Sequence, residues 1–242
     1  MRRSIVVLAL ALAGALSATT ALAATLTGTA GSDTLIGSPA ADTADGLAGN
    51  DTVAGLGGAD TLDGGRGNDT VLGDACPPTP DGTDACVPGA ARADRITGGT
   101  GNDTLSGNGG ADRVNGDGGR DVVIGNTGND RLSGGSAGDR LVGGRGRDLL
   151  SGNSGNDRLE GGASADRLTA GTGNDRLIGG TAPDRLSAGT GRDTVEAGPG
   201  NDAIFTRDRN RDVVNCGAGT DTVSADRRDK VSANCERVTR RS

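Results

Sequence analysis

The sequence predicts an all-β protein, a parallel β-solenoid in which two nine-residue units form each 18-residue coil. Three observations predict it: aspartate recurs every nine residues, an aliphatic residue follows two places later, and glycine occupies most positions between them. Nine residues is not a helical period, and helices disfavour this much glycine. A glycine-rich turn followed by a short strand with one inward-pointing residue fits the unit. Stacked coils would place each strand about 4.8 Å from its equivalent 18 residues later.

The composition limits the kind of core that this fold can have. The chain has 242 residues, of which 46 are glycine and one, Phe205, is aromatic, and it contains no histidine. Average usage would give about 17 glycines. A globular core of this length normally uses aromatic side chains for bulk, so this core should be thin and aliphatic. Such a composition also suits a disordered chain, and the regular spacing is what favours a folded one.

The segment 1–23 has the pattern of a secretory signal peptide. Arg2 and Arg3 precede an apolar run over 5–16, and Ala21-Leu22-Ala23 forms an A-x-A cleavage signal. A membrane anchor is the alternative, but the run is shorter than the roughly 20 residues that span a bilayer. We therefore expect a secreted chain that begins near Ala24, without a membrane span. Its net charge would be −9, because the two arginines are lost from a chain of charge −7.

Two blocks of repeats follow, at 24–73 and 91–224. A Leu, Val or Ile stands two residues after nearly every aspartate of the series, and these side chains should fill the core. The spacing is nine residues within each block, with one step of ten that ends at Asp212. The other members of the series are Asp33, Asp42, Asp51, Asp60, Asp69, Asp94, Asp103, Asp112, Asp121, Asp130, Asp139, Asp148, Asp157, Asp166, Asp175, Asp184, Asp193, Asp202 and Asp221.

An insertion at 74–90 separates the two blocks and contains the stretch CPPTPDGTDAC. Its proline and cysteine content predicts a stapled loop that protrudes from the solenoid; a partner-binding role is the alternative to a passive surface loop. Export would place the four cysteines in an oxidising compartment, where disulfides form. Of the three possible connectivities, sequence proximity favours Cys76–Cys86 and Cys216–Cys235. A zinc site would need closer spacing and usually histidine.

The segment 225–242 is expected to form a cap and a basic tail. Before it, Asp208, Asn210 and Asp212 resemble the start of an EF-hand loop, but Val213 replaces the loop's glycine and no glutamate ends it. We interpret this stretch as a distorted repeat. The end of a solenoid exposes unpaired strands, so a terminal cap is needed.

The stretches GGRGNDTVL (64–72) and GGTGNDTLS (98–106) match the nonapeptide G-G-x-G-x-D-x-U-x, in which U is a large aliphatic residue. With about twenty such units in register, the chain resembles the repeat-in-toxin, or hemolysin-type, calcium-binding repeat family. The resemblance extends from Gly28 to Ser224, apart from the insertion. It implies a right-handed parallel β-roll with calcium held in the turns between adjacent coils.

The chemistry of the unit agrees with what the resemblance implies. Two carboxylates about 4.8 Å apart repel by roughly 1 kcal/mol in water, and by about 3–4 kcal/mol at an effective dielectric constant of 20. Calcium reverses the sign, since it accepts six to eight oxygen ligands, and glycine lets carbonyl groups approach the ion. Two aliphatic side chains per coil bury too little surface to offset the ordering of a coil, so folding should require calcium. The candidate ligands are the aspartates of the series other than Asp212.

Alternate members of the series should share an edge of the roll. Asp103 and Asp121 are expected on one edge, and Asp112 and Asp130 on the other. The calcium sites should not be equal in strength. The turns ending at Asp166 and Asp184 carry Ser164 and Ala182 where most units have glycine. A side chain resists positive φ at that position, which predicts that the site between these turns is the weakest.

No catalytic activity is expected. The segment 134–138 matches the G-x-S-x-G pattern of serine hydrolases, but we interpret the match as a coincidence of glycine-rich repeats. The chain has no histidine to act as a base. Nearly all residues from Gly28 onward belong to repeats, which disfavours a secreted enzyme with a separate catalytic domain.

Arginine follows the aspartate in most units after the insertion. These side chains should point outward in ladders, either as a solvated surface that resists edge association or as a strip that binds an anionic polymer. The sequence as a whole predicts a secreted calcium-binding protein. The alternative is a calcium-dependent adhesion or cell-envelope matrix protein that binds anionic glycans. No nucleic-acid partner is expected, and the oligomeric state is left open. The outward arginines are Arg95, Arg113, Arg131, Arg140, Arg158, Arg167, Arg176 and Arg185.

Overall fold

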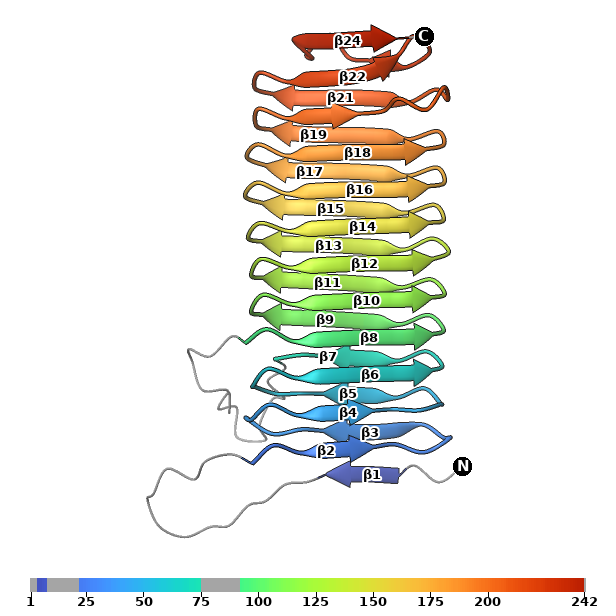
Figure 1. The fold of residues 1–242 in the computed structure, drawn as a ribbon, viewed down its shortest axis with the longest axis vertical. Coiled ribbons are helices and arrows are strands. Elements are labelled where there is room, and N and C mark those ends of the chain that lie inside the picture. The colour runs from blue at the N-terminus through green and yellow to red at the C-terminus, as the bar shows by residue number, and fades with distance from the viewer. Residues whose placement is uncertain (1–3, 8–21, 75–91, 242) are drawn as a thin grey trace, which may run out of the picture.

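The computed structural model describes residues 4–7, 22–74 and 92–241, and the regular structure in these ranges consists of β-strands. Two parallel sheets face each other in a tall column, with β1 at one end and β24 at the other (Figure 1). The first sheet contains β1 (Ser4–Val7), β3 (Asp33–Ile36), β5 (Thr52–Ala54), β7 (Thr70–Leu72), β9 (Thr104–Gly109), β11 (Val122–Thr127), β13 (Arg140–Arg145), β15 (Arg158–Ala163), β17 (Arg176–Thr181), β19 (Thr194–Pro199), β21 (Val213–Ala218) and β23 (Lys230–Val231). The second contains β2 (Thr25–Thr27), β4 (Thr43–Asp45), β6 (Thr61–Arg66), β8 (Arg95–Thr100), β10 (Arg113–Gly118), β12 (Arg131–Ser136), β14 (Leu149–Ser154), β16 (Arg167–Thr172), β18 (Arg185–Thr190), β20 (Ala203–Phe205), β22 (Thr222–Asp226) and β24 (Arg237–Arg241).

The chain alternates between the two sheets at every turn, so each strand pairs with the strand two places on. Val114 lies opposite Leu132, and Leu132 lies opposite Leu150, a step of 18 residues. Across the insertion the step becomes 34 residues, and Leu62 lies opposite Ile96. The predicted parallel β-roll with 18-residue coils is confirmed.

Most strands of the main block are longer than the repeat predicts. The three-residue pattern implies strands with one inward residue, but β8 continues to Thr100 and includes Gly98 and Gly99 of the following turn. Gly99 lies opposite Asp117 of the next coil. The extension occurs because the backbone groups of a turn find partners in an equivalent turn stacked on it. Two residues of each long strand therefore point inward, the aliphatic residue and the first residue of the next turn.

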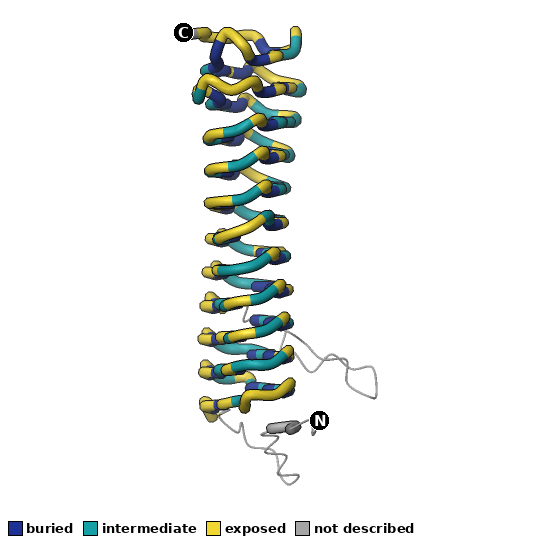
Figure 2. Tube along the Cα trace, turned by 90° about the vertical axis from the view of Figure 1, so that its right-hand side faces the viewer, coloured by how far each residue is buried: buried dark blue, intermediate teal, exposed yellow. Residues whose placement is uncertain are grey.

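The core is a line of aliphatic side chains between the sheets, one from nearly every strand. Leu105, Leu141 and Leu150 are fully buried, and Ala44 is the smallest member of the line. Figure 2 shows buried, half-buried and exposed residues alternating along every coil instead of gathering in one central region. Each coil consequently packs on its neighbours alone, which is the arrangement of a solenoid.

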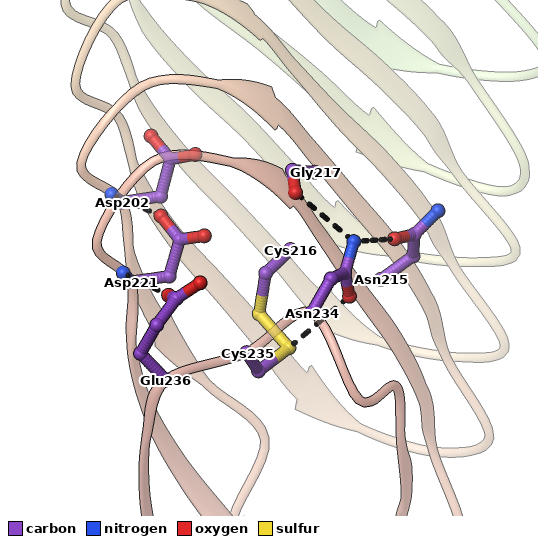
Figure 3. The surroundings of a disulfide bond; sticks show 8 residues. All are labelled: Asp202, Asn215, Cys216, Gly217, Asp221, Asn234, Cys235 and Glu236. Carbon is purple, nitrogen blue, oxygen red and sulfur yellow. Dashed lines mark hydrogen bonds between the residues drawn. A yellow bond between two sulfur atoms is a disulfide. The ribbon is translucent and has the colours of Figure 1, made fainter.

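A disulfide between Cys216 in β21 and Cys235 holds the C-terminal coil, as the sequence predicts. The two Cα atoms are 5.3 Å apart, and the bond lies near the C-terminal end of the aspartate series at Asp221 (Figure 3). β23 and β24 belong to the segment expected to form the cap. They pair in parallel with β21 and β22, so the two sheets continue through that segment.

Several predictions concern residues outside the described ranges. The proposed bond Cys76–Cys86 lies there, as does the insertion after Asp74. Of the segment 1–23, the structure describes Ser4–Val7, which pairs with β3, and Leu22 and Ala23. Signal-peptide cleavage and secretion stay predictions. A search of the described residues for helices that could span a bilayer finds none.

Candidate metal centre in the turns

Each edge of the roll carries a ladder of buried aspartates. Every member stands at the end of a turn and is at most 4% exposed. After the first member of each ladder, every aspartate accepts through Oδ1 the backbone N–H of the aspartate one coil earlier. The N–H of Asp103 donates to Oδ1 of Asp121 at 2.8 Å. The predicted division between two edges is thereby confirmed. One ladder consists of Asp33, Asp51, Asp69, Asp103, Asp121, Asp139, Asp157, Asp175, Asp193 and Asp212. The other consists of Asp42, Asp60, Asp94, Asp112, Asp130, Asp148, Asp166, Asp184, Asp202 and Asp221.

The second carboxylate oxygen, Oδ2, is buried without a hydrogen-bond donor in most of these aspartates, including Asp103 and Asp112. Buried polar atoms normally have a partner, and leaving one unpaired costs about 1–3 kcal/mol. Burial accordingly raises the pKa of Asp103 to about 6 and that of Asp112 to about 7, and the adjacent ladder carboxylates add to the rise. Each ladder is therefore a row of oxygens that a cation would stabilise.

Glycine at the first and fourth positions of most turns keeps space beside these oxygens. At the first position, a Cβ on Gly98 would lie 2.6 Å from Oδ2 of Asp103 and 2.9 Å from the carbonyl oxygen of Gly116. At the fourth position, a Cβ on Gly128 would overlap the carbonyl oxygen of Gly110 and lie 3.1 Å from an aspartate Oδ1. In the described part of the chain, the carbonyl of Gly110 accepts no hydrogen bond. The turns thus bring carboxylate and carbonyl oxygens around points that a side chain would fill.

The donor atoms of these turns are carboxylate and carbonyl oxygens. Calcium takes six to eight such ligands in a flexible geometry. Structural zinc sites use nitrogen and sulfur ligands instead. The chain has no histidine, and Cys216 and Cys235 are bonded to each other. The residues present therefore fit calcium, and successive turns of one ladder would hold it.

The turns ending at Asp166 and Asp184 differ from their neighbours in backbone conformation. Most fourth-position glycines have φ between 113° and 150°, a region that residues with a side chain avoid. Ser164 and Ala182 have φ of 81° and 84° instead, and Ala137 at the same position of another turn has 78°. The smaller φ keeps the Cβ atom farther from the preceding coil, but it also changes the orientation of the adjacent peptide groups. That the site between these two turns binds calcium most weakly stays a prediction.

Sequence reasoning missed four acidic residues that join or adjoin the ladders. Asp212, left out of the candidate ligands, accepts the N–H of the preceding ladder member at 2.9 Å. Asp229 and Glu236 accept the N–H groups of the last ladder members at 3.1 and 2.8 Å, so they extend both ladders into the C-terminal segment. A count in steps of nine does not reach them, although their spacing of 17 and 15 residues from the ladder ends is one coil. Asp74 is the fourth and lies at the start of the insertion.

A search of the curated proteins finds no match to the chain. A family model for the RTX calcium-binding nonapeptide repeat matches it in six stretches, 20–53, 45–75, 88–123, 116–150, 151–182 and 178–208. Together these stretches cover more than half of the chain, including most units of both ladders. The chain belongs to the family of proteins with RTX calcium-binding nonapeptide repeats.

Proposed function

We propose that the protein is a secreted calcium-binding roll whose folding is coupled to calcium binding, and that it has no catalytic activity. The observation that carries the proposal is the pair of ladders whose buried Oδ2 atoms have no hydrogen-bond donor. Membership of a calcium-binding repeat family supports calcium as the cation. The absence of histidine from the sequence supports a binding role over acid–base or nucleophilic catalysis.

The coupling of folding to calcium binding follows from the positions of the ladder oxygens. Without a cation, folding at neutral pH buries carboxylates whose pKa burial has raised, so the ladders oppose the fold. The oxygens that would bind one ion come from two successive coils, which are 18 residues apart in sequence. These coils are adjacent only in the folded roll. The free energy of calcium binding therefore becomes free energy of folding.

Circular dichroism across a calcium titration tests this proposal. The calcium-free protein should be largely disordered and should gain β-structure with a midpoint on the order of 10⁻⁴–10⁻³ M, the range of extracellular calcium modules. Magnesium is the matched control, because it demands near-ideal octahedral geometry and keeps several waters, so it should be much less effective. A complete β spectrum in excess chelator would contradict the coupling. Equilibrium dialysis without calcium uptake would contradict the binding itself.

A second candidate function rests on the edge of the roll where the turns lead into β12, β14, β16 and β18 of the second sheet. A groove of about 460 Å³ there has the exposed Leu149 on its wall, at the one place where the arginine ladder is interrupted. Among the described residues the salt bridges are Arg158–Glu160 and Arg176–Glu196, both formed by arginines of the first sheet. The arginines of the groove therefore have no acidic partner of this kind in the described chain. They are Arg131, Arg147, Arg167 and Arg185.

We infer that this groove binds an anionic polysaccharide in a calcium-dependent manner, as an adhesion or matrix protein would. Guanidinium groups match carboxylate and sulfate geometry with paired N–H donors. Asp130, Asp148 and Asp166 also line the groove and would repel a polyanion until calcium neutralises them. Calcium binding in the turns would thus switch the groove from repulsive to attractive.

A pull-down on an immobilised uronic-acid polysaccharide tests the groove, with and without calcium. Arg131→Gln combined with Arg167→Gln should reduce retention. The control, Arg140→Gln combined with Arg158→Gln, removes two arginines of the equivalent ladder on the first sheet and should leave retention unchanged. Equal loss in both double variants, or undiminished retention in chelator, would show that the groove is not the binding surface.

A further inference from the structure

The turn at the insertion is chemically different from all the regular turns. Asp74 follows Gly73, which occupies the first position of the turn that ends at Asp94, and the insertion leaves the roll directly after Asp74. The chain rejoins the same turn at Arg92, whose backbone N–H donates to Oδ2 of Asp74 at 2.9 Å. This hydrogen bond connects the two ends of the insertion and orients the Asp74 carboxylate.

Three carboxylates converge at this turn. One oxygen each of Asp60, Asp74 and Asp94 lies within 4.8 Å of the other two, and no other group of three acidic, cysteine or histidine side chains is so close within the described chain. Asp60 and Asp94 are 2% and 3% exposed. Oδ2 of Asp60, Oδ2 of Asp94 and Oδ1 of Asp74 are all buried without a hydrogen-bond donor. The cluster therefore presents three unpaired carboxylate oxygens, where regular turns of a ladder present two.

Ordinary features of the fold do not account for this concentration of charge. Asp60 and Asp94 each use Oδ1 in the ladder, so their free Oδ2 atoms are the ones left to face Asp74. Burial raises the pKa of Asp94 to about 8, and the carboxylates of Asp74, Asp60 and Asp112 add to the rise. No arginine, lysine or histidine forms a salt bridge with any of them in the described residues.

We propose that Asp60, Asp74 and Asp94 form a three-carboxylate calcium site that binds more tightly than the two-carboxylate sites of the regular turns. The proposal rests on the calcium-binding function proposed above and adds Asp74, which lies outside the nonapeptide pattern, as a ligand. Calcium affinity rises with the number of charged ligands. An ion at this site also joins Asp74, the first residue of the insertion, to Asp94, the first ladder aspartate after it. It therefore fastens the N-terminal block of coils to the main block across the insertion.

The chain contains a matched control for Asp74. Asp117 also occupies the second position of a turn, the one that ends at Asp121. Its side chain is exposed and accepts a hydrogen bond from Asn115 instead of entering the ladder. Asp74→Asn and Asp117→Asn therefore make the same chemical change at equivalent positions. Only Asp74→Asn removes a buried carboxylate that could bind calcium.

The test is calcium binding to the full-length secreted chain by equilibrium dialysis at limiting calcium. The wild type should bind its first calcium at least about tenfold more tightly than the average of the rest. Asp74→Asn should weaken that first binding by about tenfold or more, and Asp117→Asn should leave it unchanged. Equal first-site affinities in the two variants would overturn the proposal. If the wild type binds calcium at other sites, that result leaves the general calcium function standing.

A second measurement does not depend on how the variants fold. Chelator is titrated into the calcium-loaded wild type while amide hydrogen exchange is followed by mass spectrometry. Peptides that contain Asp60 or Asp94 should lose protection last. Earlier loss there than in the coils around Asp130 would overturn the proposal. Absence of any calcium-dependent protection would instead overturn the calcium function as a whole.

Discussion

Alanine at Gly119 should destabilise the roll locally, whereas alanine at the adjacent Gly118 should not. Gly119 holds the fourth position of its turn with φ of +124°. A Cβ there would overlap the carbonyl oxygen of Gly101 and lie 2.5 Å from its carbonyl carbon. A Cβ on Gly118 would meet nothing closer than Oγ of Ser136 at 3.6 Å. The two variants thus add the same methyl group to neighbouring residues in opposite environments.

Two free-energy terms add at Gly119. Alanine must rotate toward the φ of 78° that Ala137 adopts at the same position one coil later, and that conformation costs a non-glycine residue about 1–2 kcal/mol. The rotation also strains the 3.3 Å hydrogen bond from Gly119 N–H to the carbonyl of Ser136, which is worth about 1 kcal/mol. The expected loss is about 2–3 kcal/mol, or roughly 30- to 150-fold in an opening equilibrium. Alanine at Gly118 makes the unfolded chain less flexible and should therefore stabilise the roll by less than about 1 kcal/mol.

Amide hydrogen exchange in saturating calcium measures this difference locally, which suits a solenoid that need not unfold as one unit. Gly119→Ala should accelerate exchange in β11 (Val122–Thr127) by roughly 30- to 150-fold. Gly118→Ala should leave exchange there unchanged or make it slower. Equal exchange in the two variants would refute the argument that the approach of the preceding carbonyl requires glycine at the fourth position.

Leu150→Asp places a charge at a fully buried core position and should abolish the protection of amides in the neighbouring coils. The control Leu149→Asp changes a side chain that is 40% exposed and should leave protection intact. Unchanged exchange around Leu150 in the first variant would contradict this. Glycine at Ser164 and Ala182 together should strengthen calcium binding between their two turns, and a titration in which that site already fills as early as regular sites in the wild type would contradict the prediction. The calcium-free roll should gain β-structure as pH falls from neutral to about 4. Its carboxyl pKa values are raised, that of Asp112 from 3.8 to about 7, so their stabilising contribution is complete below 3.8 and is lost as pH rises through about 7. Circular dichroism measures this gain, with sedimentation to exclude aggregation near the pI of about 4.7; β-structure that is constant or falls on acidification would contradict it.

Sequence proximity favoured the pairing of Cys216 with Cys235, and the sequence by itself determined the parallel roll, its 18-residue coil and the two aspartate edges. These features depend on a local pattern repeated many times. Each coil stacks on the next in the same register. If Leu105 points into the core, the equivalent residue of every other coil therefore points into the core as well. The same logic places Asp103 on Asp121 without knowledge of any contact.

The tertiary structure alone decided how the turns use their atoms. It extended the strands through Gly98 and Gly99, and it divided most ladder carboxylates into a hydrogen-bonded Oδ1 and an unpaired Oδ2. It also brought Asp74 beside Asp60 and Asp94, although the insertion separates Asp74 from the second of them. None of these follows from the repeat, because each depends on the distance between atoms of different coils. A nine-residue pattern specifies which residue types recur, whereas stacking segments 18 or 34 residues apart determines which of their oxygens meet.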